Sequence, residues 1–263
     1  MSSFGVDLYS DRTGGDPNYK LDVGNVLGRT FSTWASNLVP FFLVGVVVFL
    51  PVLLGHAVMG LLDIQSPGLT LTLTLVQNVL GLVLIGAITY GVFVHVRGEK
   101  AELGEVLRKG FSRLGSVWVV GLLSGILIGL GFCALIVPGL ILLTRYWLAM
   151  PVAVIESPGI WPSMKRSEDL TEGNRWPIFA VVLIMGMINL VGSLALGVLI
   201  GLLPISQHTV AGRSVLSPLG SALVTLVTIP LATLAAVAPA LGYHDLRVGR
   251  EGADVEELLS VFD

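Results

Sequence analysis

Charged side chains are scarce in this chain. Asp, Glu, Lys and Arg make up 13% of its 263 residues, whereas a soluble globular domain carries about 25%. Five runs contain none of these four residue types, and each exceeds the roughly 20 residues that a helix needs to cross a bilayer. The composition therefore predicts a polytopic membrane protein. The runs are Thr30–Leu62, Ile64–Val96, Leu114–Thr144, Trp176–Gly212 and Ser214–His244.

Cysteine is almost absent as well. The single one, Cys133, lies inside an apolar run, which excludes a disulfide framework and a cysteine-rich metal site. The sequence has no GxSxG elbow, no Walker loop and no HExxH motif, and its four histidines lack the spacing of metal ligands. We therefore expect no catalytic residue, no metal and no cofactor, and a protein that is not an enzyme.

The apolar runs predict six transmembrane helices. Four follow directly from the runs, but the stretch from Leu114 to Ile155 would be about 63 Å long as a single helix, roughly twice the hydrocarbon core. We expect it to turn at Ile136–Leu140 and so to give two spans. The predicted spans are Leu38–Leu62, Leu69–His95, Val117–Val137, Leu140–Glu156, Trp176–Leu203 and Leu216–Tyr243.

The placement of Lys and Arg predicts the orientation. Thirteen of the 15 basic residues fall in the two terminal segments or in the links after the second and fourth spans. Arg145 lies inside a span, and Arg213 lies in an opposite loop. Because cytoplasmic loops are enriched in Lys and Arg, this bias predicts that both termini are cytoplasmic.

An internal repeat divides the chain into three units. The segments "LDVGNVLGRTFSTW" from Leu21 and "AELGEVLRKGFSRL" from Ala101 align without gaps, and a more diverged third copy begins at Gly159. Each precedes a pair of spans. We interpret each as an amphipathic helix, either lying in the membrane interface or capping the bundle, two arrangements that are compatible.

The segment "PSMKRSEDLTEGNRW", Pro162–Trp176, concentrates charge between two apolar stretches. We interpret it as the third amphipathic helix, Ile160–Glu172, with Gly173 as a left-handed stop. Its charges are nearly balanced, which favours mutual pairing. We predict a structural clamp in which Glu156, Arg166 and Arg175 tie two spans to the helix between them.

These residues also resemble a known family. Arg145, Glu156, Arg166-Ser167, Leu170-Thr171, Gly173 and Trp176 follow the pattern of the membrane domain attached to some glycerophosphoryl diester phosphodiesterases, and of its stand-alone relatives of unknown function. The resemblance covers roughly Leu21–Leu246 and is most specific over Arg145–Trp176. It implies a location in the bacterial cytoplasmic (inner) membrane, and it implies no particular activity.

Arg145 is the most unusual charge, because a charge within a span costs several kcal/mol. One interpretation is a binding site for an anionic lipid or solute inside the bundle. The other is a structural arginine that snorkels to the outer interface or bonds to helix-end carbonyls. We favour the second.

The sequence thus predicts an all-α integral membrane protein of six transmembrane helices in three hairpins, each preceded by a cytoplasmic amphipathic interfacial helix. Residues 1–20 are expected to be a disordered cytoplasmic tail, 21–246 the membrane domain and 247–263 an acidic cytoplasmic tail. We expect a scaffold or accessory protein that organises lipids or partner proteins. Its expected partners are membrane lipids and other membrane proteins, and not nucleic acid. The alternative is a transporter of a small or lipid-like solute, favoured by a water-filled central cavity.

Overall fold

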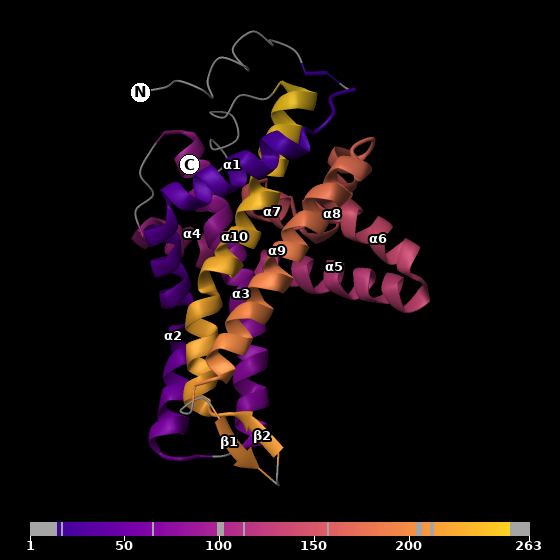
Figure 1. Cartoon of the computed structure of the whole chain (residues 1–263). Helices are drawn as coiled ribbons and strands as arrows, with labels where there is room; N and C mark the ends of the chain where they lie inside the picture. Colours follow the sequence, from indigo (N-terminus) through magenta and orange to yellow (C-terminus); the bar gives the residue numbers. More distant parts are fainter. Residues whose placement is uncertain are drawn as a thin grey trace.

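The computed structural model describes residues 15–16, 18–64, 66–98, 103–112, 114–156, 158–203, 207–210 and 213–252. Over these residues the chain is almost entirely helical (Figure 1). The elements are α1 Val23–Ser36, α2 Leu38–Leu61, α3 Pro67–Val96, α4 Leu103–Ser112, α5 Leu114–Ala134, α6 Ile136–Arg145, α7 Ala149–Ile155, α8 Ile160–Thr171, α9 Arg175–Gly201, β1 Gln207–Val210, β2 Arg213–Leu216 and α10 Pro218–Glu251.

The predicted fold class is confirmed. Six segments of the described chain are long and apolar enough to cross a membrane. They form three hairpins, α2–α3, α5–α6–α7 and α9–α10, and the amphipathic helices α1, α4 and α8 precede them in turn. The loop between α9 and α10 carries a short antiparallel pair, β1 and β2. The protein is therefore a polytopic membrane protein.

Serine caps and prolines fix where the return helices begin. The hydroxyl of Ser66 accepts a hydrogen bond from the amide of Leu69, and that of Ser217 accepts one from Gly220. A proline follows each serine at the first helical position, where its missing N–H costs nothing. Asp22 caps α1 in the same way, by accepting from the amide of Asn25.

The fourth span differs from the prediction. Instead of one helix over Leu140–Glu156, the chain forms α6 and α7, separated after Arg145. Pro151 lies in the first turn of α7; a helix running through from α6 would place its ring against the carbonyl of Trp147, so the helix ends before it. The turn before this span also differs from the predicted Ile136–Leu140. It lies at Leu135, which is extended, and α6 already begins at Ile136.

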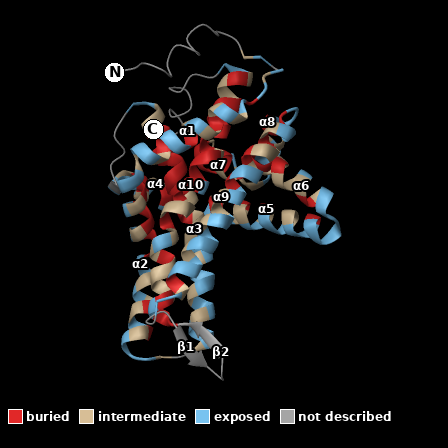
Figure 2. Ribbon diagram, viewed as in Figure 1, coloured by how far each residue is buried: buried red, intermediate tan, exposed pale blue. Residues whose placement is uncertain are grey.

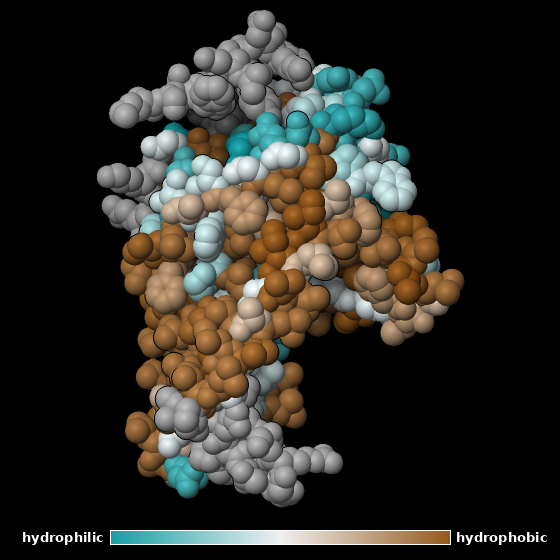
Figure 3. All heavy atoms as spheres, in the orientation of Figure 1, coloured by the Kyte–Doolittle hydropathy of each residue, from teal (hydrophilic) through white to brown (hydrophobic). Residues whose placement is uncertain are grey.

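The main core is an apolar cluster to which α2, α3, α7, α9 and α10 all contribute. A smaller cluster of Val120, Ala149, Ala153 and Met164 joins α5, α7 and α8. Burial is concentrated in the half of the molecule that carries α1 and α8 (Figure 2). We call that end, with the last turns of α10, the polar end. The opposite end, with the α2–α3 turn and the β-hairpin, is the distal end. Figure 3 shows a broad hydrophobic surface between the two, as expected of helices that face lipid.

The two tails are described only in part. Residues 1–14, 17 and 253–263 lie outside the described residues. At the N-terminal side, the amide of Asp16 donates to the carbonyl of Gly249, and the amine of Lys20 donates to Gly173 at 2.6 Å. At the other end, α10 continues past Leu246 to Glu251. Residues on both sides of the expected membrane domain, 21–246, therefore contact it or continue its last helix.

Candidate functional site

Helix α8 is the junction at which the third hairpin meets the rest of the molecule. It begins and ends at glycines with positive φ, Gly159 at 105° and Gly173 at 73°, a region that a side chain disfavours. Gly173 is thus the predicted left-handed stop. One face of α8, with Ser163, Met164 and Ser167, is buried. We call α8, with the groups that contact it, the α8 junction.

The charged face of α8 joins the ends of two other helices. The Nε of Arg166 donates to both oxygens of Glu156, the residue that ends α7, at 3.1 and 3.2 Å. Its two terminal nitrogens donate to the two oxygens of Glu251 on α10, at 2.6 and 2.7 Å. The hydrogen bonds to Glu251, with the charge of Glu156, raise the pKa of Arg166 above its usual value. A single cation therefore holds α7, α8 and α10 together.

Helix α10 supplies two more members of this network. The hydroxyl of Tyr243 donates to Glu156 Oε1 at 2.8 Å and accepts from Arg247 Nη1 at 2.8 Å. Arg247 also lies 3.6 Å from Glu156 and 3.6 Å from Glu251. Two carboxylates, two arginines and a phenol thus form a continuous network at the polar end, in which every charge faces an opposite one.

Ser167 fills the gap between α6 and α7. Its hydroxyl donates to the carbonyl of Arg145 at 2.8 Å and accepts from the amide of Leu148 at 3.2 Å. The hydroxyl of Thr171, one turn later, lies 3.4 Å from the same carbonyl. Interrupting a helix leaves backbone groups without intrahelical partners. The two hydroxyls of α8 provide those partners. The break in the fourth span is therefore supported by Ser167 and Thr171 of α8.

The favoured interpretation made Arg145 a structural residue that snorkels to the outer interface or bonds to helix-end carbonyls. Its guanidinium instead forms an ion pair with Glu168 on α8, at the polar end. The reason is the break after Arg145, which ends α6 beside α8. The hydrogen bond from Arg145 holds the pKa of Glu168 below its usual value. The anionic group that Arg145 contacts is therefore part of the protein.

The remaining predicted residues have separate positions. Arg175 is exposed at the start of α9, and its charge contributes to the lowered pKa of Glu168. Leu170 is buried in the core cluster, whereas Trp176 is 82% exposed and stacks edge-on against Phe179. Of the three clamp residues, the structure brings Glu156 and Arg166 together.

Several residues of the α8 junction were not predicted. Arg250 donates to the carbonyls of Asp169, Leu170 and Glu172, and so caps the C-terminus of α8. Asn174 binds the N-terminal segment through the amide of Leu21 and the carbonyl of Tyr19. A signal for the α10 residues was present in the sequence, because Tyr243, Arg247, Arg250 and Glu251 recur at spacings of three and four.

A second charged cluster fastens α1 to α10. Arg29 on α1 forms an ion pair with Asp245, which is almost fully buried. The same carboxylate oxygen lies 3.1 Å from Nδ1 of His244, whose ring packs against Phe93. Within the described residues, no group of three or more His, Cys, Asp or Glu side chains is arranged to hold a metal ion.

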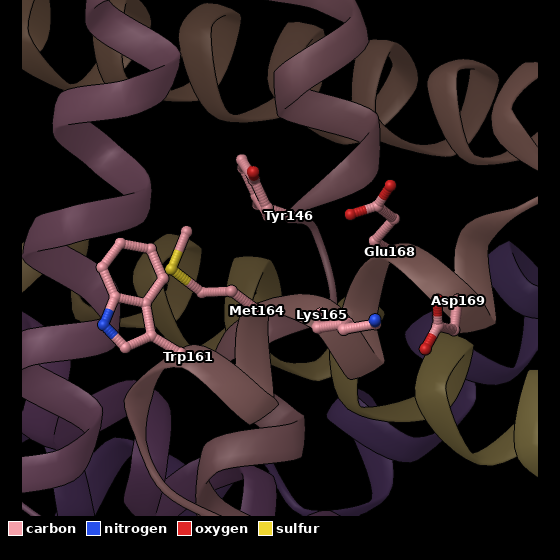
Figure 4. Close-up of a pocket in the computed structure, with 6 residues that line it drawn as sticks. All are labelled: Tyr146, Trp161, Met164, Lys165, Glu168 and Asp169. Atoms are coloured by element: carbon pink, nitrogen blue, oxygen red, sulfur yellow. The ribbon is translucent and has the colours of Figure 1, made fainter.

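An open hollow of ≈ 390 Å³ lies along the outer face of α8, under Tyr146 (Figure 4). Trp161 and Met164 line one part of it, and Lys165 and Asp169 line another. The hollow therefore offers an aromatic ring, a cation and a carboxylate side by side at the polar end. Glu168, the partner of Arg145, completes its lining.

Comparison with known proteins gives the family of the chain and no activity. No curated protein and no solved structure matches it. A family model described as a domain of unknown function, DUF7847, matches residues 29–245, from α1 to the ion-paired Asp245 on α10. The match covers most of the 263 residues and includes the whole α8 junction except the last turn of α10. The chain therefore belongs to the DUF7847 family.

Proposed function

We propose that the protein is a non-enzymatic membrane scaffold that organises lipids at the α8 junction. The observation that carries this proposal is that the charges within and beside the spans are paired with one another. Glu156 and Glu251 are balanced by Arg166 and Arg247, and Arg145 is paired with Glu168. Charges arranged in this way stabilise a fixed structure and are poorly suited to handling a substrate.

The packing of the bundle supports a scaffold over a transporter. A transporter would need a polar path between the spans, with its site near the bilayer midplane. The centre of this bundle is instead filled by large, fully buried apolar side chains from several helices, including Ile88, Ile155 and Ile229. Arg145, which could have lined such a path, turns toward α8.

The hollow beside α8 gives the lipids a place to bind. Lys165 would contact the phosphate of a headgroup, Asp169 would contact a headgroup amine, and the ring of Trp161 would lie at the level of the interface. The chemistry favours a phospholipid with both charges, or an anionic one that uses Lys165 alone. Other membrane proteins are a further kind of partner for such a scaffold.

We also infer that the polar end faces the cytoplasm. The support is the concentration of Lys and Arg in the segments that fold there, set against Arg213 near the distal end. The resemblance to the membrane domain of some glycerophosphoryl diester phosphodiesterases is interpreted as a shared α8 junction: the residues that carry it, such as Ser167 and Gly173, are those that hold α8 in place.

Mass spectrometry of the molecules that copurify with the detergent-extracted protein tests the function. We expect phospholipid to be retained, and we expect Lys165→Ala to retain less of it. Lys109→Ala removes the same charge from α4, away from the hollow, and should retain as much as the unaltered protein. A stoichiometric water-soluble solute, or equal retention by both variants, would contradict the proposal.

A further inference from the structure

The α5–α6 hairpin projects sideways from the bundle instead of running along it. Figure 1 shows α2, α3, α9 and α10 side by side, with α5 and α6 extending away from them. The buried positions of α5 agree. Val117, Val120 and Ser124 are buried between the start and the middle of α5, and the next buried residue, Gly131, lies against Gly139 of α6. The outer half of this hairpin, which we call the arm, thus packs on itself.

The arm leaves the bundle about halfway along α3. A Cβ on Gly121 would lie 3.1 Å from the side chain of Leu82, and one on Gly86 would lie 3.9 Å from Val117. Leu82 and Gly86 precede the polar end of α3, Val96, by roughly 15–21 Å at 1.5 Å per residue. Since half of the hydrocarbon core is about 15 Å thick, α5 runs near the bilayer midplane.

The second helix of the arm, α6, lies closer to the polar end. Helix α6 runs back toward α8, where its last residue, Arg145, pairs with Glu168. In Figure 1 the outer parts of α5 and α6 both lie on the polar side of the middle of the bundle. The arm therefore occupies the depth of one leaflet, the leaflet at the polar end.

The tip of the arm has the composition of a segment inside a membrane. Leu135, Ile136 and Val137 are 65–70% exposed, and the sequence from Cys133 to Leu143 contains no charged or hydrogen-bonding side chain other than the thiol. By contrast, the turns at the distal end carry Asp63 and Ser66, or Arg213 and Ser214. A turn exposed to water would be expected to carry polar side chains, as the distal turns do.

The backbone of the tip is also suited to the interior of a membrane. A single non-helical residue, Leu135, separates α5 from α6. Its amide donates to Gly131, its carbonyl accepts from Gly139, and Pro138 has no N–H to satisfy. Unpaired backbone groups cost several kcal/mol each in hydrocarbon, so a turn this tight can end within the bilayer where an ordinary loop could not.

We propose that the arm is a re-entrant hairpin that enters and leaves on the polar side, and that it makes the protein a wedge. At the polar end the leaflet must accommodate the arm in addition to α2, α3, α9 and α10, whereas at the distal end it accommodates these four alone. A protein that is wider in one leaflet favours a membrane that is convex on that side. This inference deepens the proposed lipid-organising function, on which it rests, by naming membrane curvature as what is organised.

The depth of the tip is the first test, and the chain carries its own probe. Cys133 is exposed at the tip and is the single cysteine, so it can be labelled with bimane in the unaltered protein. After reconstitution into vesicles with phosphatidylcholines brominated at different acyl positions, we expect the strongest quenching from bromines near the chain ends. As a control, Leu62→Cys in a Cys133→Ser background marks the distal turn and should be quenched most by bromines near the headgroup.

Each other outcome overturns the proposal. If Cys133 shows the same shallow profile as Leu62→Cys, the arm either crosses the bilayer or lies on its surface. If no bromine quenches it, protein covers the tip, as in an arm packed on a second copy. Neither result affects retention of lipid by Lys165, so failure of the wedge and failure of the scaffold are distinguishable.

Orientation in vesicles of different size tests the curvature preference. Glu172→Cys in the Cys133→Ser background reports, through labelling by a membrane-impermeant maleimide, which way the polar end faces. We expect a clear majority of polar ends outward in small, highly curved vesicles, and loss of that preference in large ones. Ile136→Lys draws the tip toward the headgroups and should reduce the preference. Equal orientation in both sizes, or a preference that Ile136→Lys leaves unchanged, would overturn the wedge.

Discussion

Arg166 and Glu251, which are 85 residues apart in the sequence, form two parallel hydrogen bonds, Nη1 to Oε1 at 2.6 Å and Nη2 to Oε2 at 2.7 Å. A bidentate pair of this kind fixes orientation as well as distance. Because Arg166 also donates to Glu156, it cannot move toward one carboxylate without leaving the other. Arg166 therefore links α8 to both α7 and α10, in addition to the bonds that Ser167 and Arg250 make.

Removing either member of the Glu156–Arg166 pair should destabilise the protein. The cost of breaking a fully buried pair from one side is about 3–5 kcal/mol. We expect about 1–3 kcal/mol for Glu156→Ala and for Arg166→Ala, because solvent screens a pair whose side chains are 19% and 28% exposed. Thermal unfolding in detergent measures the loss. The double variant should lose less than the sum of the two, since the residues share a network.

Arg175→Ala is the matched control for this cycle. It removes the same charge from an exposed position at the start of α9, where surface substitutions usually change stability by about 0.5 kcal/mol or less. Strictly additive losses for Glu156 and Arg166, or an equal loss for Arg175→Ala, would show that the pair does not act as a clamp.

Ser167→Ala should be costly because it removes the hydroxyl partner of the Leu148 amide and leaves the carbonyl of Arg145 with the longer contact to Thr171. The hydroxyl of Ser167 serves both the carbonyl of Arg145 and the amide of Leu148 at the break between α6 and α7. Leaving a buried group unsatisfied costs about 1–3 kcal/mol, and we expect a loss of that size in thermal unfolding.

Ser163→Ala provides the comparison. Ser163 is equally buried, but its hydroxyl bonds the carbonyl of Gly159, which also accepts from the amide of Ser163 itself. That carbonyl keeps a partner, so the loss should be smaller. If the two serines were equivalent, the hydroxyl of Ser167 would not be what supports the break.

Local features of the fold could be read from the sequence. The apolar runs predicted most ends of the spans to within a few residues, apart from the broken fourth span and the longer α10, and Gly173 predicted the end of α8. Both kinds of signal depend on a few neighbouring residues. The serine and proline before α3 and α10 belong to the same class of signal. These signals can be interpreted without knowing which residues lie on the other side of the bundle.

The partners of the charges could not be read in the same way. Arg145 was expected to snorkel outward or to bond to helix-end carbonyls, whereas the break after it ends α6 beside Glu168 on α8. Glu251 was assigned to an acidic tail because it follows the last apolar run, although α10 continues to it. Both errors concern where a helix ends relative to a distant element, which composition does not specify.

The Arg145–Glu168 pair predicts a pH dependence. The pKa of Glu168 is lowered in the folded protein by its hydrogen bond from Arg145. A carboxylate with a lowered pKa contributes stability above its unfolded pKa, about 4.3 for Glu, and that contribution is lost as the pH falls through the folded value. We expect Glu168→Gln to be less stable than the unaltered protein at neutral pH, and the difference to shrink below about pH 4.

Thermal unfolding in detergent from neutral to acidic pH measures this difference. Glu172→Gln is the control, because it removes the same charge from an exposed residue at the end of the same helix. Its stability should follow that of the unaltered protein at every pH. A difference between Glu168→Gln and the unaltered protein that persists undiminished at low pH would mean that the carboxylate acts by something other than its charge.

Helix α4 is held against α3 by a close approach of the two backbones at Gly110. A Cβ at this position would lie 2.8 Å from the Cβ of Ala87 and 3.1 Å from its Cα, so a larger residue must push the helices apart. Nearby, Val106 is buried and Tyr90 donates to Glu105 at 2.5 Å. We expect Gly110→Leu to lower the stability by about 1–3 kcal/mol, the usual cost of overpacking.

Gly104→Leu makes the same substitution on the same helix, where nothing lies within 4 Å of the added Cβ. Both variants gain helix propensity, worth up to about 1 kcal/mol for replacing a glycine, so Gly104→Leu should be neutral or stabilising in thermal unfolding. The difference between the two variants then isolates the packing of α4 on α3. If both were stabilising, α4 would be free to move away from α3, and the amphipathic helix would belong to the membrane interface more than to the bundle.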